Sequence, residues 1–299
     1  MPALRKRIPI AGAVTAAAGL AWGHFEAGWV RLDTLECPLR RLPAELAGVR
    51  IAHLSDFHLG MPSRGSRAVA LAVDWVGERA PDLTLISGDL LSRRSGEPRL
   101  RELVARLPSC FAVLGNHDFG RSRDPFADSD PVSDLGDATL LRDDSRTVEL
   151  RGRRIQIVGV DPRSYRRGTS RPWRLADETA DFRILLCHFP NVFDRLPAGV
   201  FDLVLAGHLH AGQITLPVPG RRVPLAHPRW RYFHGLYERG ETLMHVSAGL
   251  GTTFVPFRFL ARPEATELEL QRESPEGRSV ASGAPRCRSE VVEPSPKRA

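Results

Sequence analysis

Residues 49–60 read Val-Arg-Ile-Ala-His-Leu-Ser-Asp-Phe-His-Leu-Gly, a short apolar run followed by an aspartate and a histidine two positions apart. The run at 49–54 has the length and apolar content of a buried strand. Because it stops at Leu54, Asp56 and His58 are expected in the turn that follows. Both side chains can bind a metal ion, so chemistry is expected where this strand ends.

Four further apolar runs end in the same way. They span residues 83–86, 110–114, 184–187 and 203–206. The metal-capable or acid–base side chains that follow them are Asp89, Asn116, His117, Asp118, His188, His208 and His210. The carboxyl ends of strands in an open α/β sheet face one crevice. The five turns are therefore expected to converge, although 154 positions separate Asp56 from His210.

Segments with helical spacing lie between these runs, at residues 68–76 and 100–107. Further apolar runs at 155–160 and 243–246 are typical of buried strands. The alternation of strand-like and helix-like segments, without an internal repeat, predicts an α/β fold. Glycines at 88, 115 and 207 would let the backbone turn sharply beside a bound ion.

The formal net charge of +7 and the pI of about 9.9 invite a nucleic-acid or membrane partner. Most of that charge is terminal: residues 1–31 carry +3 and residues 272–299 carry +2, which leaves +2 for residues 32–271. We therefore expect an N-terminal signal or membrane-anchor segment at 1–31, a folded domain at 32–271 and a disordered tail at 272–299. A nucleic-acid partner is not favoured.

The N-terminal segment places Arg5-Lys6-Arg7 before the weakly apolar residues 8–22. Fifteen residues are fewer than the roughly 20 of a membrane span. The length suits a signal-peptide core, or an anchor if the segment through Val30 is included, and an Ala-rich buried helix is the structural alternative. Basic residues before the apolar stretch favour a membrane-associated protein whose domain lies outside the cytoplasm, with the cytoplasmic side left open.

The ligand types indicate the metal chemistry. Two carboxylates, one carboxamide and four imidazoles suit manganese, iron or zinc, and they are too many for one ion. Two divalent ions repel each other, so they need a shared anionic ligand, and Asp89, alone on its turn, is the natural bridge. Asp56, His58 and His210 would complete one site. Asn116, His188 and His208 would complete the other, and a hydroxide bridging both ions would be the nucleophile.

His117 remains outside this ligand set, next to Asp118. A protonated imidazole at this position could stabilise charge on phosphoryl oxygens or protonate the leaving group. Asp118 would orient it. Both residues are therefore predicted to be catalytic. The four cysteines lack the paired spacing of a disulfide framework or a thiolate zinc site.

The ordered blocks Asp56-x-His58, Gly88-Asp89, Gly115-Asn116-His117-Asp118, His188 and Gly207-His208-x-His210 resemble the calcineurin-like metallophosphoesterase superfamily. The resemblance covers residues 49–212. It implies a four-layer αββα sandwich with a dinuclear metal site at the strand ends, and it carries over the ligand roles assigned above.

Three segments are similar, more narrowly, to the small bacterial branch with an N-terminal membrane anchor, which includes UDP-2,3-diacylglucosamine pyrophosphatase-like enzymes. The segments are 56–60, 208–213 and 246–252. Ala211 stands where that branch usually has Gly, and Ala248 where it usually has Arg. The second departure puts a substrate-phosphate contact near residue 248 in doubt.

These patterns predict a metallophosphoesterase that hydrolyses phosphoester or pyrophosphate bonds, with a phosphate-containing small molecule or a lipid-linked or cell-envelope compound as substrate. A cyclic-nucleotide or other nucleotide phosphodiesterase has the same ligand order and stays open, as does a scaffold that has lost its metals. Purple acid phosphatases use a tyrosine three residues after the bridging aspartate, where this chain has Ser92.

Overall fold

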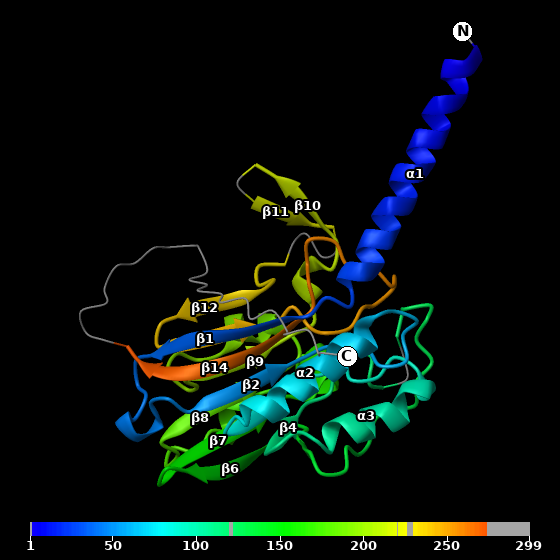
Figure 1. Ribbon diagram of the computed structural model, residues 1–299. Helices are drawn as coiled ribbons and strands as arrows, with labels where there is room; N and C mark the ends of the chain where they lie inside the picture. Colours follow the sequence, from blue (N-terminus) through cyan, green and yellow to red (C-terminus); the bar gives the residue numbers. More distant parts are fainter. Residues whose placement is uncertain (1, 120–121, 220, 226–229, 274–299) are drawn as a thin grey trace.

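Two six-stranded sheets form the body of the computed structural model, which describes residues 2–119, 122–219, 221–225 and 230–273 (Figure 1). The first sheet has the order β1 (Arg31–Leu39), β14 (Glu264–Arg272), β2 (Arg50–Leu54), β3 (Leu83–Ile86), β4 (Cys110–Ala112) and β5 (Thr139–Leu140). The second has the order β12 (Gly235–Arg239), β13 (Thr242–Val246), β9 (Leu203–Ala206), β8 (Phe182–Leu186), β7 (Arg153–Gly159) and β6 (Asp144–Leu150).

Four parallel strands lie side by side in each sheet. In the first sheet β2, β3, β4 and β5 are parallel, and in the second β13, β9, β8 and β7 are. Strands covered on both faces consist of nearly continuous apolar residues, which is why these segments stand out in the sequence. Their carboxyl ends share one edge of each sheet, and the candidate ligands follow them there.

The sheets pack face to face around a core to which both contribute, for example Leu85 and Phe111 from the first and Ile184 and Leu205 from the second. The helices α2 (Gly65–Arg79) and α3 (Glu97–Val104) cover the outer face of the first sheet. The outer face of the second is covered by residues 190–195, a 3₁₀ segment, and by side chains such as Tyr232. The predicted four-layer sandwich is confirmed, with short helical turns as its fourth layer.

The remaining elements are short. The α-helix α4 spans Pro162–Arg166, and β10 (Thr215–Val218) and β11 (Arg221–Pro224) form a separate antiparallel hairpin. The 3₁₀ segments are Ala44–Leu46, Arg94–Gly96, Pro172–Leu175, Pro190–Arg195 and His210–Gly212.

The helix α1 (Pro2–Glu26) extends away from the body, and only its last turns contact it (Figure 1). The Phe259 ring lies against Gly23, and Glu26 Oε1 accepts a hydrogen bond of 2.9 Å from the Ala261 amide. Across the described residues, α1 included, every helix falls short of the length and apolarity that crossing a membrane requires. Residues 274–299 of the predicted tail lie outside the described residues, and the three-part division of the chain stays a prediction.

Candidate metal centre

The predicted ligands converge where the strands end, and several of them have unusual backbone conformations. Positive φ angles occur at Asp56 (53°), His58 (45°), Asp89 (54°), His208 (78°) and His210 (50°). A residue other than glycine costs about 1–2 kcal/mol in this left-handed region. Strain of this kind gathers at functional sites, where it aims side chains that a relaxed turn would direct elsewhere.

Asp56, His58 and His210 form one group. His58 Nε2 lies 3.2 Å from His210 Nε2, and Asp56 Oδ1 lies 3.9 Å and 3.5 Å from the same two nitrogens. All three residues are buried. Their ligand atoms fall within 4.8 Å of one another, which is close enough for all three to hold one metal ion. This is the first of the two groups that the sequence predicts.

Asp89 lies between this group and a second one. Its Oδ2 is 3.5 Å from His58 Nε2 and 3.2 Å from His188 Nε2. On the far side, His188 Nε2 is 3.2 Å from Asn116 Oδ1 and 3.1 Å from His208 Nδ1. All seven predicted ligands therefore meet at one place, with a single carboxylate between the two groups.

The protonation states fit the binding of cations. Burial lowers the pKa of His58 to about 3 and holds the pKa of His210 well below its usual range, so both imidazoles are neutral and offer lone pairs. Burial also lowers the pKa of His188, but the negative charge of Asp89 outweighs it and raises that pKa to about 9. The point between Asp89 and His188 thus attracts positive charge strongly, and the oxygen and nitrogen donors fit two divalent ions.

His117 and Asp118 differ from the sequence prediction in one respect. Asp118 does not orient the imidazole of His117: its carboxylate accepts hydrogen bonds of 2.8–3.0 Å from the backbone amides of Gly115, Leu90 and Leu91. Neighbouring side chains on a turn point in different directions, so His117 and Asp118 are adjacent in the sequence while the Asp118 carboxylate faces backbone amides. Asp118 fixes the turn instead, and burial raises its pKa to about 7. The ring of His117 lies 4.7 Å from that of His58, inside the cluster.

A family comparison agrees with this geometry. Residues 49–212 match the model of the family described as calcineurin-like phosphoesterase. That range is more than half of the chain, and it begins just before β2 and ends just after His210. The chain belongs to the calcineurin-like phosphoesterase family. It is therefore a phosphoric ester hydrolase of a family that uses divalent metals.

Several relatives of this metallophosphoesterase cover most of its length. It is 31% identical over 280 residues to the uncharacterized metallophosphoesterase YkuE of Bacillus subtilis, covering 87% of this chain and 93% of that protein. It is 28% identical over 271 residues to the phosphodiesterase YaeI of Escherichia coli, with 87% and 96% covered. A transmembrane protein with metallophosphoesterase domain from Danio rerio is 32% identical over 255 residues, with 80% of this chain and 56% of that protein covered.

Serines in the segments that follow β2 and β3 support the ligands of the metallophosphoesterase site. Ser92 Oγ lies 2.8 Å from His58 Nδ1, and Ser55 Oγ donates a hydrogen bond of 2.5 Å to Asp56 Oδ2. The Ser87 carbonyl can only accept, so the His188 Nδ1 that lies 2.8 Å away carries a proton, and Nε2 is the nitrogen left to face a cation. Partners of this kind fix the tautomer and direction of a ligand.

Arg258 is a residue that the sequence analysis missed. It is fully buried, and its guanidinium donates to the carbonyls of His210, Ala248, Gly249 and Gly251 (2.6–3.4 Å). The carbonyl of Ala248 is thus held by an arginine ten residues later in the chain. Arg258 has no motif around it, so the sequence offered no signal.

The glycines beside the ligands are required mainly for space. A Cβ at Gly207 would lie 2.0 Å from Ser55 Oγ and 2.4 Å from Asp56 Oδ2, and one at Gly115 would lie 2.0 Å from Asp89 Oδ1. Of the three glycines singled out in the sequence, Gly88 alone has a positive φ, of 97°. The turns therefore bring the backbone close to the ligands, which only glycine permits.

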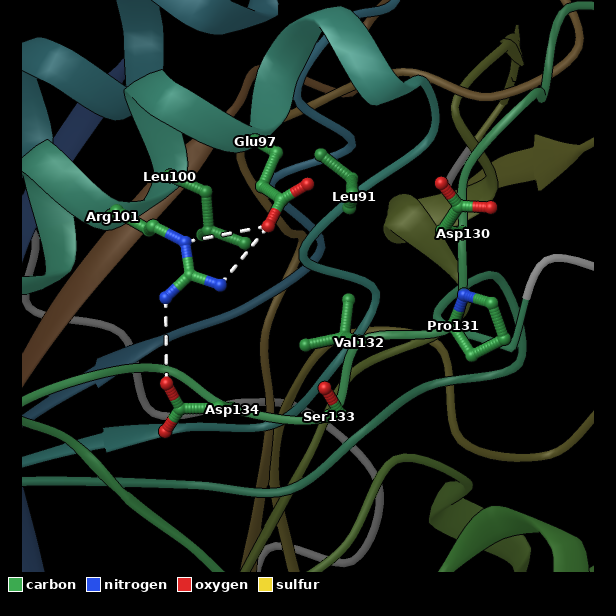
Figure 2. A pocket seen from close by; sticks show the side chains of 9 residues that line it. All are labelled: Leu91, Glu97, Leu100, Arg101, Asp130, Pro131, Val132, Ser133 and Asp134. Atoms are coloured by element: carbon green, nitrogen blue, oxygen red, sulfur yellow. Dashed lines mark hydrogen bonds and ion pairs between the residues drawn. The ribbon is translucent and has the colours of Figure 1, made fainter.

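A separate small cavity lies between α3 and residues 130–134, as Figure 2 shows. Its volume is about 230 Å³. Arg101 lies across it and forms ion pairs with Glu97 (3.0 Å) and Asp134 (3.4 Å). None of the candidate ligands lines it, so this cavity is distinct from the metal centre.

The replacement Gly207→Ala tests the packing of the backbone against the ligands. We expect it to reduce bound metal at both positions and to lower the free energy of unfolding by about 1–3 kcal/mol, because the new methyl group overlaps Ser55 and Asp56. The matched control is Gly77→Ala in α2, where nothing lies within 4 Å of the new Cβ. That variant should be more stable by about 0.5–1 kcal/mol. Metal analysis and urea unfolding measure both, and full metal content in Gly207→Ala would contradict the interpretation.

Ala211 provides a test of the strain at the site. Its backbone has φ 50° and ψ 29°, a left-handed conformation that favours glycine. The change Ala211→Gly should raise the free energy of unfolding by about 0.5–1 kcal/mol, since relief of the strain exceeds the entropy that glycine loses. In the control Ala70→Gly, within α2, stability should fall by about 1 kcal/mol. A loss of stability in both variants would contradict the interpretation that the backbone of Ala211 is strained.

Proposed function

We propose that the chain hydrolyses phosphoester or pyrophosphate bonds with two divalent ions, on a lipid-linked or cell-envelope substrate. The observation that carries the proposal is the position of Asp89 between two groups of ligands. In this assignment Asp56, His58 and His210 hold one ion, Asn116, His188 and His208 hold the other, and Asp89 binds both. The ions are manganese, iron or zinc.

Two ions bound there would lower the pKa of a water molecule and neutralise the charge of the substrate phosphate. The protein residues supply the rest of the chemistry. His117 Nδ1 is buried and, among the described residues, has no hydrogen-bond partner. Its Nε2 lies 3.4 Å from Ser122 Oγ. The free Nδ1 can therefore donate a proton to the leaving-group oxygen or stabilise a phosphoryl oxygen.

Asp118 acts on this chemistry through the backbone. By holding the amides of Gly115, Leu90 and Leu91, it fixes the turn that carries Asn116 and His117. The His117 amide in turn donates a hydrogen bond of 2.8 Å to Asp89 Oδ1. The proposed bridge and the proposed acid are thus tied to one rigid turn, which keeps their separation constant.

A lipid-linked substrate and a membrane partner are supported by the N-terminal segment. Residues 8–23 contain no charged side chain and follow Arg5-Lys6-Arg7. A relative from Danio rerio is named a transmembrane protein. Both features favour a phosphate group that is presented at a membrane surface.

Replacing the bridge tests the metal assignment. We expect Asp89→Ala to lose both ions, because each group keeps only three ligands and the repulsion between the ions is no longer screened. The control is Asp74→Ala, which removes an exposed carboxylate on α2. Metal analysis of purified protein should give two ions per chain for the wild type and the control. Two ions in Asp89→Ala would contradict the assignment.

His117→Ala separates chemistry from metal binding. The variant should keep two ions and hydrolyse a chromogenic aryl phosphodiester roughly 10² to 10⁴ times more slowly with added manganese, the usual contribution of general acid catalysis. A wild-type rate would exclude His117 as the acid. A panel of lipid phosphates, sugar nucleotides, nucleotides and cyclic nucleotides then tests the substrate. Faster turnover of free or cyclic nucleotides than of every lipid phosphate would overturn the lipid-linked class.

A further inference from the structure

Exposed apolar side chains gather at one end of the molecule. The large ones among the described residues lie on α1, at Trp29, on or beside the β10–β11 hairpin, in residues 254–260 and at Phe126. Figure 1 shows α1 and the hairpin extending from the same side of the body. Six of these side chains, which we term the apolar face, are 37–49% exposed: Trp22, Phe25, Trp29, Leu216, Phe254 and Leu260.

The segments that carry the apolar face are joined to one another. The Phe259 ring lies against Gly23 of α1, and the Phe259 carbonyl accepts a hydrogen bond of 3.0 Å from the Thr215 amide of the hairpin. Phe126 belongs to the same region, because Asp124 accepts hydrogen bonds from the amides of both Phe126 (2.8 Å) and Phe254 (2.7 Å). The exposed apolar residues therefore form one region and are not scattered singly over the surface.

Aromatic rings and cations alternate within this region. Phe25 lies 5.7 Å from both Trp22 and Trp29, measured between ring centroids. The Arg262 guanidinium lies 3.8 Å from the Trp29 ring, and that of Arg64 lies 5.8 Å from the Phe25 ring. Tryptophan and arginine side chains, each part apolar and part polar, are enriched where a protein meets lipid headgroups.

The helix α1 identifies the partner as lipid. Its residues 12–22 are exposed on all sides, apart from the half-buried Gly19, and none of them is charged. A protein partner covers one stripe of a helix and leaves the opposite side in water, whereas lipid can surround a helix that is apolar all round. The basic residues at 5–7 add attraction for anionic headgroups.

The apolar face is also linked to the metal centre. Gln213, three residues after His210, exchanges hydrogen bonds with the backbone of Thr253 at 2.8 and 3.0 Å. Arg258, between Phe254 and Leu260, donates a hydrogen bond of 3.4 Å to the carbonyl of His210. A surface that binds residues 253–260 therefore lies beside the candidate ligands.

We propose that the apolar face docks on an anionic phospholipid bilayer and presents the metal centre to phosphate groups at the lipid surface. The lipid-phosphate substrate in this inference rests on the proposed function. The docking on the bilayer rests on the apolar face alone. It adds to the N-terminal anchor a second contact, made by the body of the protein, which sets the orientation of the site on the membrane.

The test uses the full chain and the double variant Leu216→Gln/Phe254→Gln, which leaves α1 and every proposed ligand intact. Sedimentation with vesicles of phosphatidylcholine and phosphatidylglycerol should show at least tenfold weaker partitioning for the variant than for the wild type. Hydrolysis of the soluble aryl phosphodiester should be unchanged. Thr147→Gln, exposed on the edge strand β6, is the control and should behave as the wild type in both assays.

Equal partitioning of the double variant and the wild type would overturn the docking face, as would a wild type that does not sediment with the vesicles. A wild-type dimer that the double variant dissociates, seen by light scattering without vesicles, would assign the face to a second copy instead. Vesicle binding without hydrolysis of any lipid phosphate would refute the lipid-linked substrate while leaving the docking face in place.

Discussion

The carboxylate of Asp89 is the constraint on which the rest of the site depends. Its Oδ2 contacts an imidazole from each ligand group, while Oδ1 accepts the His117 amide. A single side chain can occupy this position only if the neighbouring turn comes very close. Gly115 allows that approach, because any Cβ there would overlap the carboxylate. The sheet brings β3 and β4 side by side in parallel, and the site follows from that pairing.

Behind the ligands, a chain of buried polar groups connects the two sheets. His53 on β2 contacts Ser87 Oγ (2.9 Å), which donates to Ser55 Oγ (2.7 Å), and Ser55 holds Asp56. On its other side, His53 Nδ1 lies 2.7 Å from His245 Nδ1 on β13. Burial lowers the pKa of His245 to about 4 and holds that of His53 well below its usual range, so both rings are neutral. Buried polar networks specify one arrangement, since each unmade hydrogen bond is costly.

Much of this architecture could be predicted from the sequence, for a physical reason. Strands buried on both faces consist of unbroken apolar residues, and the ligands follow them directly, so strands and site are visible together. The strands β1 and β14 were not predicted, because charged residues interrupt the apolar pattern by which a buried strand is recognised. Glu264 and Glu267 are buried in β14, and their partners Arg31 and Arg79 are each more than 180 positions away. The environment of Asp118 and the role of Arg258 escaped prediction for the same reason: both depend on contacts between distant segments.

The last turn of α1 joins the N-terminal segment to the folded domain through hydrogen bonds. The sequence suggested either a signal peptide or an anchor, and the structure shows that the last turn of this segment packs against the folded body. Glu26 is 2% exposed, and its carboxylate accepts hydrogen bonds from the Ala261 amide and from Trp22 Nε1. The Gly23 carbonyl accepts a hydrogen bond from the amide of Arg258, whose guanidinium donates to the His210 carbonyl. Removal of α1 would leave buried donors in this loop without partners, beside a proposed ligand. The end of the helix is thus part of the support of the metal centre.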